Sequence, residues 1–234
     1  MNVELINYTA NAAQLLVFTK STRLEMNPDL FTEIMEWPQE KLEAELAYMA
    51  DTIPSSWEFV DYTFLITGVS RAFTHQFVRN RTGSYAQQSM RVTDQSKYEY
   101  VSTAKTQLGE YYETYMKSCT EYAYSNMIQA GETIEDTRGI LPTNIATNIV
   151  AKFNLRTMSD LAKSRTGGRT QGEHQKVMNL MVDKVLEVHP WADKFLFNKA
   201  RDYFNDIEEF AKTELDGNVK MKLLKIVDKM RKSK

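Results

Sequence analysis

The chain has one cysteine, three histidines, nine glycines and five prolines among its 234 residues. The single cysteine, Cys119, excludes an intramolecular disulfide and a cysteine-rich zinc site, and it favours a reducing, cytoplasmic setting. Three scattered histidines do not make a histidine-built metal centre, so we expect no metal. Because glycine and proline are the main breakers of regular structure, their scarcity predicts few long loops and a predominance of helix.

Long apolar runs are missing as well. No stretch approaches 18 consecutive apolar residues, which excludes a transmembrane helix. The first ten residues lack the basic region and apolar core of a secretory signal. Hydrophobic residues make up 42% and charged residues 26%, an ordinary composition for a globular protein. We therefore expect one α+β domain over residues 1–234, in the cytoplasm and with no membrane partner.

The net charge of −2 hides an asymmetry. The last sixteen residues contain seven basic residues and one Asp, hence +6, which leaves −8 for residues 1–218. The helical spacing of Val219, Leu223, Ile226 and Met230 predicts a basic C-terminal helix at about 219–234. Such a helix can bind a membrane or a nucleic acid. We favour a helix packed on its own protein with its lysines in water, because no aromatic or arginine cluster accompanies them.

Periodicity predicts the elements of the rest of the chain. We expect strands at 2–8 and 57–67, a structured loop or irregular strand at 82–96, and helices at 38–51, 69–78, 103–130, 156–164, 173–188 and 191–213. In the tyrosine-rich helix 103–130, the residues spaced for burial are Leu108, Tyr111, Tyr112, Tyr115, Cys119, Tyr122 and Met127. On that face Cys119 is interpreted as a small core residue and not as a nucleophile.

Common reaction motifs are absent: there is no Gly-x-Gly-x-x-Gly after a strand, no phosphate loop and no Gly-x-Ser-x-Gly. A dense polar segment at 74–91 instead carries three arginines, Arg79, Arg81 and Arg91. A second arginine cluster consists of Arg156, Arg165 and Arg169. Guanidinium groups with neighbouring hydroxyl and amide groups suit an anionic small molecule, although a solvated surface or a nucleic-acid face also fits this composition.

The run Arg79-Asn80-Arg81, followed by seven residues and Ser89, resembles the Arg-His-Arg, seven residues, Ser signature of the flavin-dependent thymidylate synthases. The resemblance extends from about residue 52 to 191. Its other supporting segments are 55–59, 62–64, 68–72, 74–76, Leu141-Pro142, 154–156, Arg165 and 169–173. It implies a helix-rich α+β domain with a small, mostly antiparallel sheet.

The resemblance also implies an activity: reductive methylation of dUMP to dTMP. Methylenetetrahydrofolate would supply the carbon, NADPH the electrons, and bound FAD would mediate both transfers. This chemistry needs no cysteine nucleophile, because the cofactor carries the hard steps. The family forms homotetramers with shared active sites, so the same assembly is implied, with no nucleic acid as partner.

The resemblance assigns roles to individual residues. The implied flavin-binding residues are Ser55, Arg79, Asn80, Arg81, Gln87, Asn154, Arg156 and Asp160. The residues implied to surround the nucleotide are Gln76, Arg79, Gln87, Gln88, Ser89, Met90, Arg91, Asn148 and Arg165. Arg165 corresponds to the catalytic arginine that contacts the uracil and favours ionisation at N3.

The chain departs from the family pattern at six positions. The motif's central His is Asn80, and residues usual in the family are replaced by Ile53, Phe59, Val92, Asn148 and Gly172. One interpretation is drift in a divergent enzyme that keeps the reaction and acts in the cytoplasm, which is the host cytoplasm if the enzyme is viral. A second is a flavin- and folate-dependent hydroxymethylase, or a synthase for another pyrimidine nucleotide. A third is a nucleotide-binding homologue without activity.

Overall fold

The computed structural model describes residues 1–22, 24–52, 54–166, 172–197, 207, 210–211, 215 and 217–232. The chain divides into two compact units, Met1–Phe197 and Asn198–Lys234, and each is described by itself. The predicted α+β class is confirmed, whereas a single domain over residues 1–234 stays a prediction.

The first unit is organised around a four-stranded sheet. Its strands are β1 (Asn2–Tyr8), β2 (Asp61–Ser70), β3 (Ser84–Gln87) and β4 (Ala146–Asn154), in the order β1-β2-β4-β3. Every neighbouring pair is antiparallel, as expected. Alternate side chains of β2 and β4 are buried, and those between them are exposed or half-buried. This period of two shows that one face of the sheet is covered and the other is open.

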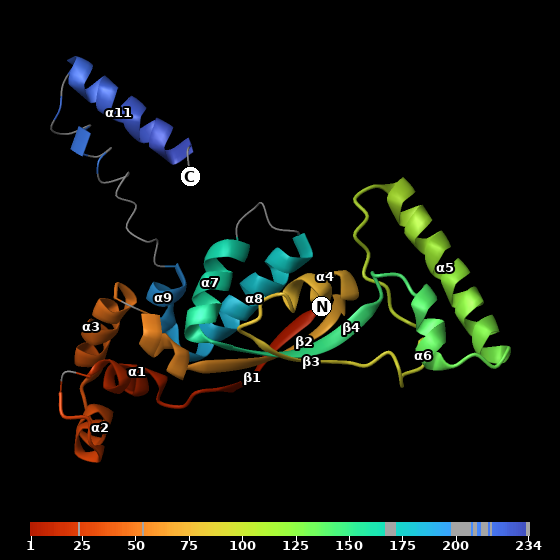
Figure 1. The fold of residues 1–234 in the computed structure, drawn as a ribbon, viewed down its shortest axis with the longest axis horizontal. Helices are drawn as coiled ribbons and strands as arrows, with labels where there is room; N and C mark the ends of the chain where they lie inside the picture. The colour runs from red at the N-terminus through yellow and green to blue at the C-terminus, as the bar shows by residue number, and fades with distance from the viewer. Residues whose placement is uncertain are drawn as a thin grey trace. The chain divides into compact units, whose positions relative to one another are not determined.

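Three helices cover the buried face: α4 (Arg71–Phe77), α7 (Leu155–Arg165) and α8 (Gly172–Val188) (Figure 1). Apolar residues of α8 recur at helical spacing and enter the core; they are Val177, Met178, Met181, Val182 and Val185. They face aromatic residues of the sheet, among them Tyr62, Phe64 and Phe153. The predicted helices at 156–164 and 173–188 are thus confirmed within a residue at each end.

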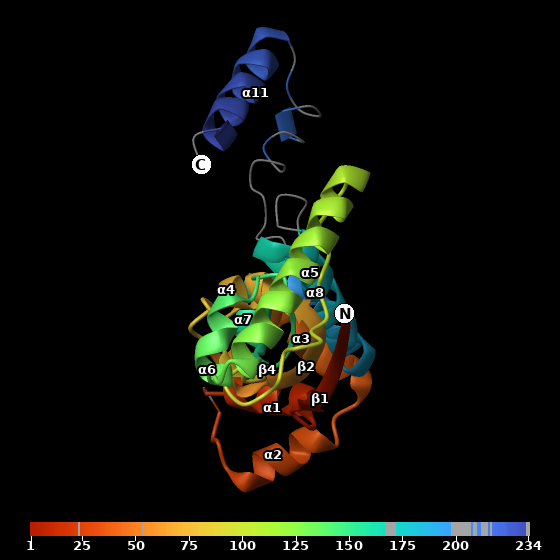
Figure 2. The same cartoon turned by 90° about the vertical axis from the view of Figure 1, so that its right-hand side faces the viewer.

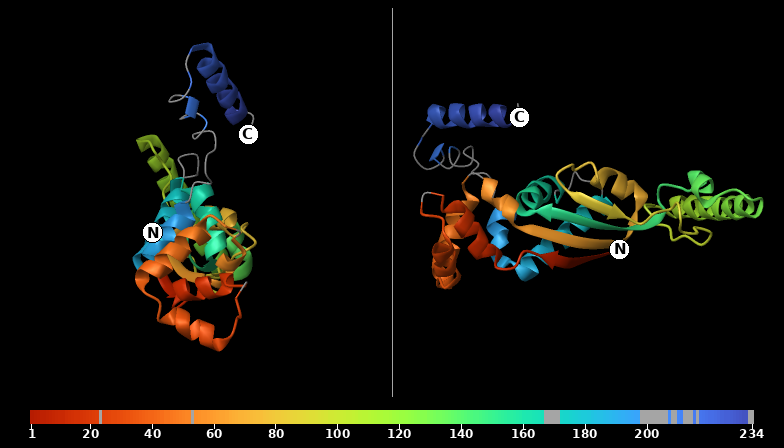
Figure 3. Two further views of the ribbon diagram at one scale, coloured as in Figure 1. Left: turned by 90° about the vertical axis from the view of Figure 1, so that its left-hand side faces the viewer. Right: turned by 60° about the horizontal axis from the view of Figure 1, so that its bottom comes forward.

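The remaining elements of this unit lie at the two ends of the sheet (Figure 3). One end carries α1 (Ala12–Lys20), α2 (Pro28–Met35), α3 (Gln39–Ala50), η1 (Pro54–Phe59), η3 (Pro190–Ala192) and α9 (Asp193–Phe197). The other end carries α5 (Gln107–Gln129), α6 (Ile134–Thr137) and η2 (Arg138–Ile140). Helices α1 and α2 were not predicted.

Helix α5 corrects one expectation. Most residues expected to be buried along it are exposed, from 55% for Tyr115 to 75% for Tyr122, and Cys119 is exposed too, whereas Met127 is half-buried. Among the described residues of α5 only Tyr124 is fully buried. The helix extends away from the sheet and contacts α6 and η2 (Figures 1 and 2). Periodicity shows which residues share a face, but not whether the same chain covers that face.

Two expected boundaries are also wrong. Residues 57–59 belong to the short helix η1, so β2 begins at Asp61, and it continues to Ser70 where a helix from residue 69 was expected. The expected loop or irregular strand at 82–96 contains the short strand β3. Of the expected helix 191–213, the structure describes η3, α9 and helical residues at 207 and 210–211, and residues 198–206, 208–209 and 212–213 lie outside the described residues.

The second unit contains α11 (Gly217–Lys232), which confirms the predicted C-terminal helix apart from residues 233–234, outside the described part of the chain. Val219, Ile226 and Met230 are at least half exposed, whereas Val227 is buried. In the parts of both units that the structure describes, no helix combines the length and apolar composition needed to cross a membrane.

Candidate active site

A cavity of about 540 Å³ lies where the C-terminal ends of α4 and α7 approach the first turn of α8. Its lining residues are Gln76, Phe77, Arg79, Asn80, Asp160, Leu161, Ser164, Arg165 and His174. Five of the residues assigned to flavin or nucleotide from the sequence meet here: Gln76, Arg79, Asn80, Asp160 and Arg165. They come from segments far apart in the chain, so the fold brings together one arginine of each predicted cluster, Arg79 and Arg165. Arg169 lies outside the described residues.

The walls of this cavity are fixed by capped helices. Ser70 caps α4, its hydroxyl accepting the Phe73 N–H at 3.0 Å, and Asn154 caps α7, its side-chain oxygen accepting the Thr157 N–H at 2.9 Å. The Glu173 carboxylate accepts the Ser70 N–H at 2.7 Å and the Ser70 hydroxyl at 2.6 Å. This carboxylate therefore ties the start of α8 to the start of α4.

The turn that carries Asn80 and Arg81 is held on the buried side by Tyr85. Its hydroxyl donates to the Asn80 carbonyl at 2.7 Å and lies 3.2 Å from the Phe77 carbonyl. Burial raises the pKa of Tyr85 to about 12, so this hydroxyl keeps its proton at neutral pH. At Gly83 an added Cβ would lie 2.6 Å from the Tyr85 hydroxyl oxygen, which explains the glycine in this turn.

The charges in the cavity favour an anion. Arg79 and Arg165 face one acidic lining residue, Asp160. In the described residues, no carboxylate lies within ion-pair distance of either arginine. Both guanidinium groups therefore keep their donors available for a ligand.

His174 adds a neutral ring to this cavity. Burial, with a smaller contribution from the positive charge of Arg165, lowers its pKa to about 4. The ring meets Phe73 and Phe77 edge to face, and its Nε2 is buried with no hydrogen-bond partner among the described residues. The imidazole is therefore uncharged at neutral pH.

Five predicted flavin-binding residues do not line this cavity: Ser55, Arg81, Gln87, Asn154 and Arg156. Ser55 lies in η1 and Asn154 at the start of α7. Arg156 pairs through its Nη1 with Glu58 Oε1 at 2.6 Å, and Arg81 is in the turn after α4. Ser55, Asn154 and Arg156 gather where η1 contacts α7, at the end of that helix opposite Arg165.

Gln87 and Gln88 are consecutive but serve different faces. The Gln87 amide donates to the Thr74 hydroxyl at 2.9 Å, on the helix-covered side. Gln88 pairs with Asn148 of β4: its N–H donates to the Asn148 carbonyl at 2.9 Å, and the Asn148 amide donates to its Oε1 at 3.2 Å. The Asn148 Oδ1 also accepts the Gly68 N–H at 3.1 Å. Gln88 and Asn148 line a second cavity, of about 780 Å³.

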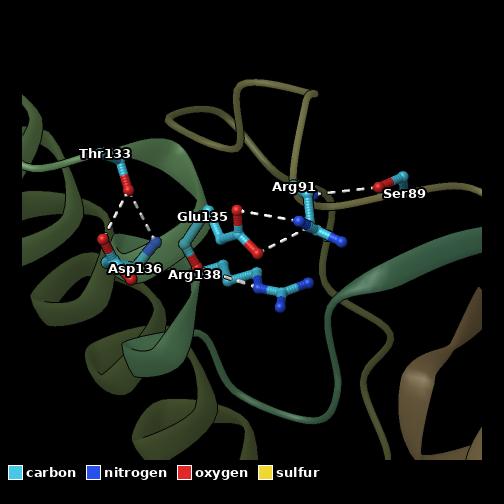
Figure 4. Close-up of polar contacts among 6 residues, drawn as sticks. All are labelled: Ser89, Arg91, Thr133, Glu135, Asp136 and Arg138. Atoms are coloured by element: carbon cyan, nitrogen blue, oxygen red, sulfur yellow. Dashed lines mark hydrogen bonds and ion pairs between the residues drawn. The ribbon is translucent and has the colours of Figure 1, made fainter.

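The loop after Gln88 carries the remaining nucleotide candidates, Ser89, Met90 and Arg91. Figure 4 shows Ser89 and Arg91. The Ser89 hydroxyl accepts the Arg91 N–H at 3.2 Å. The Arg91 guanidinium contacts Glu135 of α6 through two atoms: Nε lies 2.7 Å from Oε1 and Nη2 lies 3.1 Å from Oε2. The structure thus divides the predicted nucleotide residues between two places.

Sequence reasoning missed several residues of this region. Glu135 and Arg138 carry no motif signal, because their relation to Arg91 exists only in the folded chain. His174 had a signal, since it shares the helical period of Val177, Met178 and Met181 and could have been expected on the buried face of α8.

Comparison with known proteins adds independent information. The family model described as thymidylate synthase complementing protein matches residues 4–191. A protein of Nitratidesulfovibrio vulgaris named flavin-dependent thymidylate synthase is 31% identical over 206 residues, which cover 80% of this chain and 83% of that protein. Proteins of the same name from Pyrococcus furiosus and Sulfurisphaera tokodaii are 32% identical over 197 residues and 29% identical over 198 residues. These matches cover 80% and 81% of this chain, and 80% and 75% of the relatives.

Proposed function

Because the chain belongs to the flavin-dependent thymidylate synthase family, we propose that it catalyses the reductive methylation of dUMP to dTMP. One carbon would come from methylenetetrahydrofolate and two electrons, as hydride, from NADPH, with FAD as the bound cofactor. The products would be dTMP, tetrahydrofolate and NADP⁺. The single cysteine and the cofactors involved agree with a reaction in the cytoplasm.

The observation that carries this proposal is the cavity shared by Gln76, Arg79 and Arg165. Two arginines without a carboxylate partner, an amide and a neutral histidine form a donor-rich site suited to an anionic, planar ligand. The same donor set fits a flavin, whose ring oxygens and phosphates accept hydrogen bonds. When bound, the flavin supplies the electron transfer that no side chain can perform.

In this proposal the chain's own residues bind the nucleotide and polarise its pyrimidine ring. Arg165 ends α7 and would place its positive charge against the pyrimidine edge, where negative charge develops during the reaction. Gln76 and Arg79, one helical turn apart on α4 and its end, would orient the nucleotide beside it. The apolar edges of Phe77 and Leu161 line the same cavity and would exclude water from this contact.

We further propose a homotetramer with shared sites. Nucleotide candidates lie in two separate places, one beneath the helices and one around Gln88 and Asn148. The second copy would bring the two groups together over one ligand. The exposed face of α5, with Tyr111, Tyr112 and Tyr115 at 55–62% exposure, offers apolar surface for such contacts.

The surroundings of Asn148 support a second candidate function, a hydroxymethylase or a synthase with altered nucleotide specificity. The family resemblance implies a Lys or Arg at the position of Asn148, and both ends of the Asn148 amide are engaged, by Gly68 and by Gln88. A neutral side chain that already makes hydrogen bonds within the chain agrees with an enzyme for a different ligand. It agrees equally with sequence drift in an enzyme that keeps the family's reaction. Hydroxymethyl transfer differs in its balance, because water adds to the carbon and no electrons are consumed.

Mass spectrometry of the products tests the proposal. The protein is incubated with FAD, NADPH, methylenetetrahydrofolate and each pyrimidine deoxynucleotide in turn, with Arg165→Ala as the matched control. The expected product is dTMP from dUMP, strongly reduced in the control. A hydroxymethylated nucleotide would establish the second candidate, and no product from any nucleotide would favour an inactive binding homologue.

A further inference from the structure

The clearest polar contact between the Ser89–Arg91 loop and the rest of the fold is the ion pair of Arg91 with Glu135 (Figure 4). It is two-point: Nε to Oε1 at 2.7 Å and Nη2 to Oε2 at 3.1 Å. This side-on arrangement uses one edge of the planar guanidinium. The edge formed by Nη1 and the second Nη2 proton keeps its donors.

Glu135 itself is held by its surroundings. Thr133 caps α6, its hydroxyl accepting the Asp136 N–H at 3.1 Å and donating to the Asp136 carboxylate at 2.7 Å. The Arg138 Nε donates to the Glu135 carbonyl at 3.0 Å. The backbone that presents Glu135 is therefore fixed on both sides, which gives its carboxylate a defined direction.

The loop is fixed from the other side by Arg71. Its Nη2 donates to the Gln88 carbonyl at 2.6 Å, while its Nε is buried with no hydrogen-bond partner in the described residues. Burial, and the positive charge of Arg138, lower the pKa of Arg71. Arg71 and Arg138 therefore add two positive charges near the loop that carries Arg91.

Charged groups of both signs surround the loop. The arginines are Arg71, Arg91 and Arg138, and the carboxylates are Glu135 and Asp136 of α6 and Asp94. Asp136 is turned toward Thr133 and Asp94 toward Ser96, so Glu135 is the carboxylate that contacts Arg91. The guanidinium edge of Arg91 that Glu135 does not contact suits a phosphate.

We propose that Glu135 is a positioning residue that holds Arg91 so that its outer edge meets the phosphate of the nucleotide. This inference deepens the proposed function and rests on it, since it takes Ser89 and Arg91 as nucleotide-binding residues. The Ser89 hydroxyl oxygen accepts the Arg91 N–H, which leaves the hydroxyl proton for the same phosphate. Glu135 acts through Arg91 and touches no reacting atom.

The opposite role of Glu135 predicts the opposite change in nucleotide affinity. A carboxylate that competes with the phosphate for Arg91 would weaken nucleotide binding, and its removal would strengthen it. Glu135→Asp separates the two roles, because it keeps the negative charge but shortens the reach by one methylene. Glu135→Gln keeps the reach but loses the charge.

The test is calorimetric titration of the flavin-saturated protein with dUMP and with deoxyuridine, which lacks the phosphate. An exposed pair contributes up to about 1 kcal/mol, so Glu135→Asp and Glu135→Gln should weaken dUMP binding by about threefold to fivefold. Deoxyuridine binding should not change. Glu187→Gln, which breaks the exposed Lys184–Glu187 pair on α8, is the matched control and should bind dUMP like the wild type.

A structural role of Glu135 would change the binding of both ligands, whereas positioning changes only that of dUMP. In an Arg91→Ala background the further change Glu135→Asp should have no effect on dUMP binding. Unchanged or tighter dUMP binding by Glu135→Asp overturns the inference while leaving the proposed function intact. If the wild type binds neither dUMP nor any other pyrimidine deoxynucleotide, the proposed function fails and the inference with it.

Discussion

The carboxylate of Glu173 accepts two hydrogen bonds from one residue, Ser70, through its backbone N–H at 2.7 Å and its hydroxyl at 2.6 Å. Ser70 is fully buried at the junction of β2 and α4, and Glu173 lies in the first turn of α8. The same hydroxyl caps α4 by accepting the Phe73 N–H. This contact sets the distance between the two helices that carry Gln76 and His174 into the cavity.

Glu173→Gln should therefore destabilise the fold. An amide keeps the shape but offers one acceptor in place of two and loses the charge, and hydrogen bonds to charged groups contribute about 1.5–3 kcal/mol. We expect a loss of about 2 kcal/mol in the free energy of unfolding, measured by urea denaturation. Glu187→Gln, on the exposed side of the same helix, should change it by less than about 1 kcal/mol. Equal losses in the two variants would contradict this role of Glu173.

His174 should make stability depend on pH. Its folded pKa of about 4 lies below the ordinary value of 6.5, so between these values the unfolded chain binds more protons than the folded one. Stability should thus fall as pH falls from 7 to 5, by about 2 kcal/mol from this group. His189, whose pKa burial also lowers, acts in the same direction.

The variant His174→Leu isolates this contribution. Its free energy of unfolding should decrease less between pH 7 and pH 5 than that of the wild type, in urea titrations at both values. His189 remains as the internal control in both proteins. Parallel decreases in the two proteins would show that His174 is not neutral in the folded chain.

Arg165→Ala should lower turnover far more than it weakens flavin binding. Removal of one donor placed against developing charge costs about 3 kcal/mol, or roughly a hundredfold in rate. Turnover is measured with saturating dUMP, and flavin affinity by equilibrium dialysis. Wild-type turnover in the variant would mean that Arg165 does not meet the pyrimidine.

Asn148→Lys tests whether drift explains the missing cation. A charge-assisted contact is worth about 1 kcal/mol more than a neutral one, so dUMP binding should tighten by about fivefold. The gain should shrink as salt rises, because exposed charges are screened. The variant also loses the hydrogen bonds to Gly68 and Gln88, so the outcome measures the net effect. Binding of dUMP that stays the same or weakens would count in favour of a ligand other than dUMP.

Periodicity predicted α7 and α8, because both helices bury regular apolar stripes. The central strand β4 was not predicted, although its side chains alternate with a period of two. Periodicity failed at α5, whose regular stripe of tyrosines is exposed in the single chain. The arginine-rich segment 74–91 predicted a binding region, and five assigned residues do share a cavity. The contacts of Ser70 with Glu173 and of Arg91 with Glu135 join distant segments, and no local pattern encodes such pairs.

The most direct measurement of the central claim follows the flavin absorbance under anaerobic conditions. The protein is loaded with FAD and reduced with one equivalent of NADPH, and dUMP and methylenetetrahydrofolate are then added, singly and together. Reductive methylation consumes two electrons per nucleotide, so the oxidised flavin spectrum should return only when both are present, with one dTMP formed per flavin. A nucleotide that acquires the carbon while the flavin stays reduced would contradict the proposed reaction.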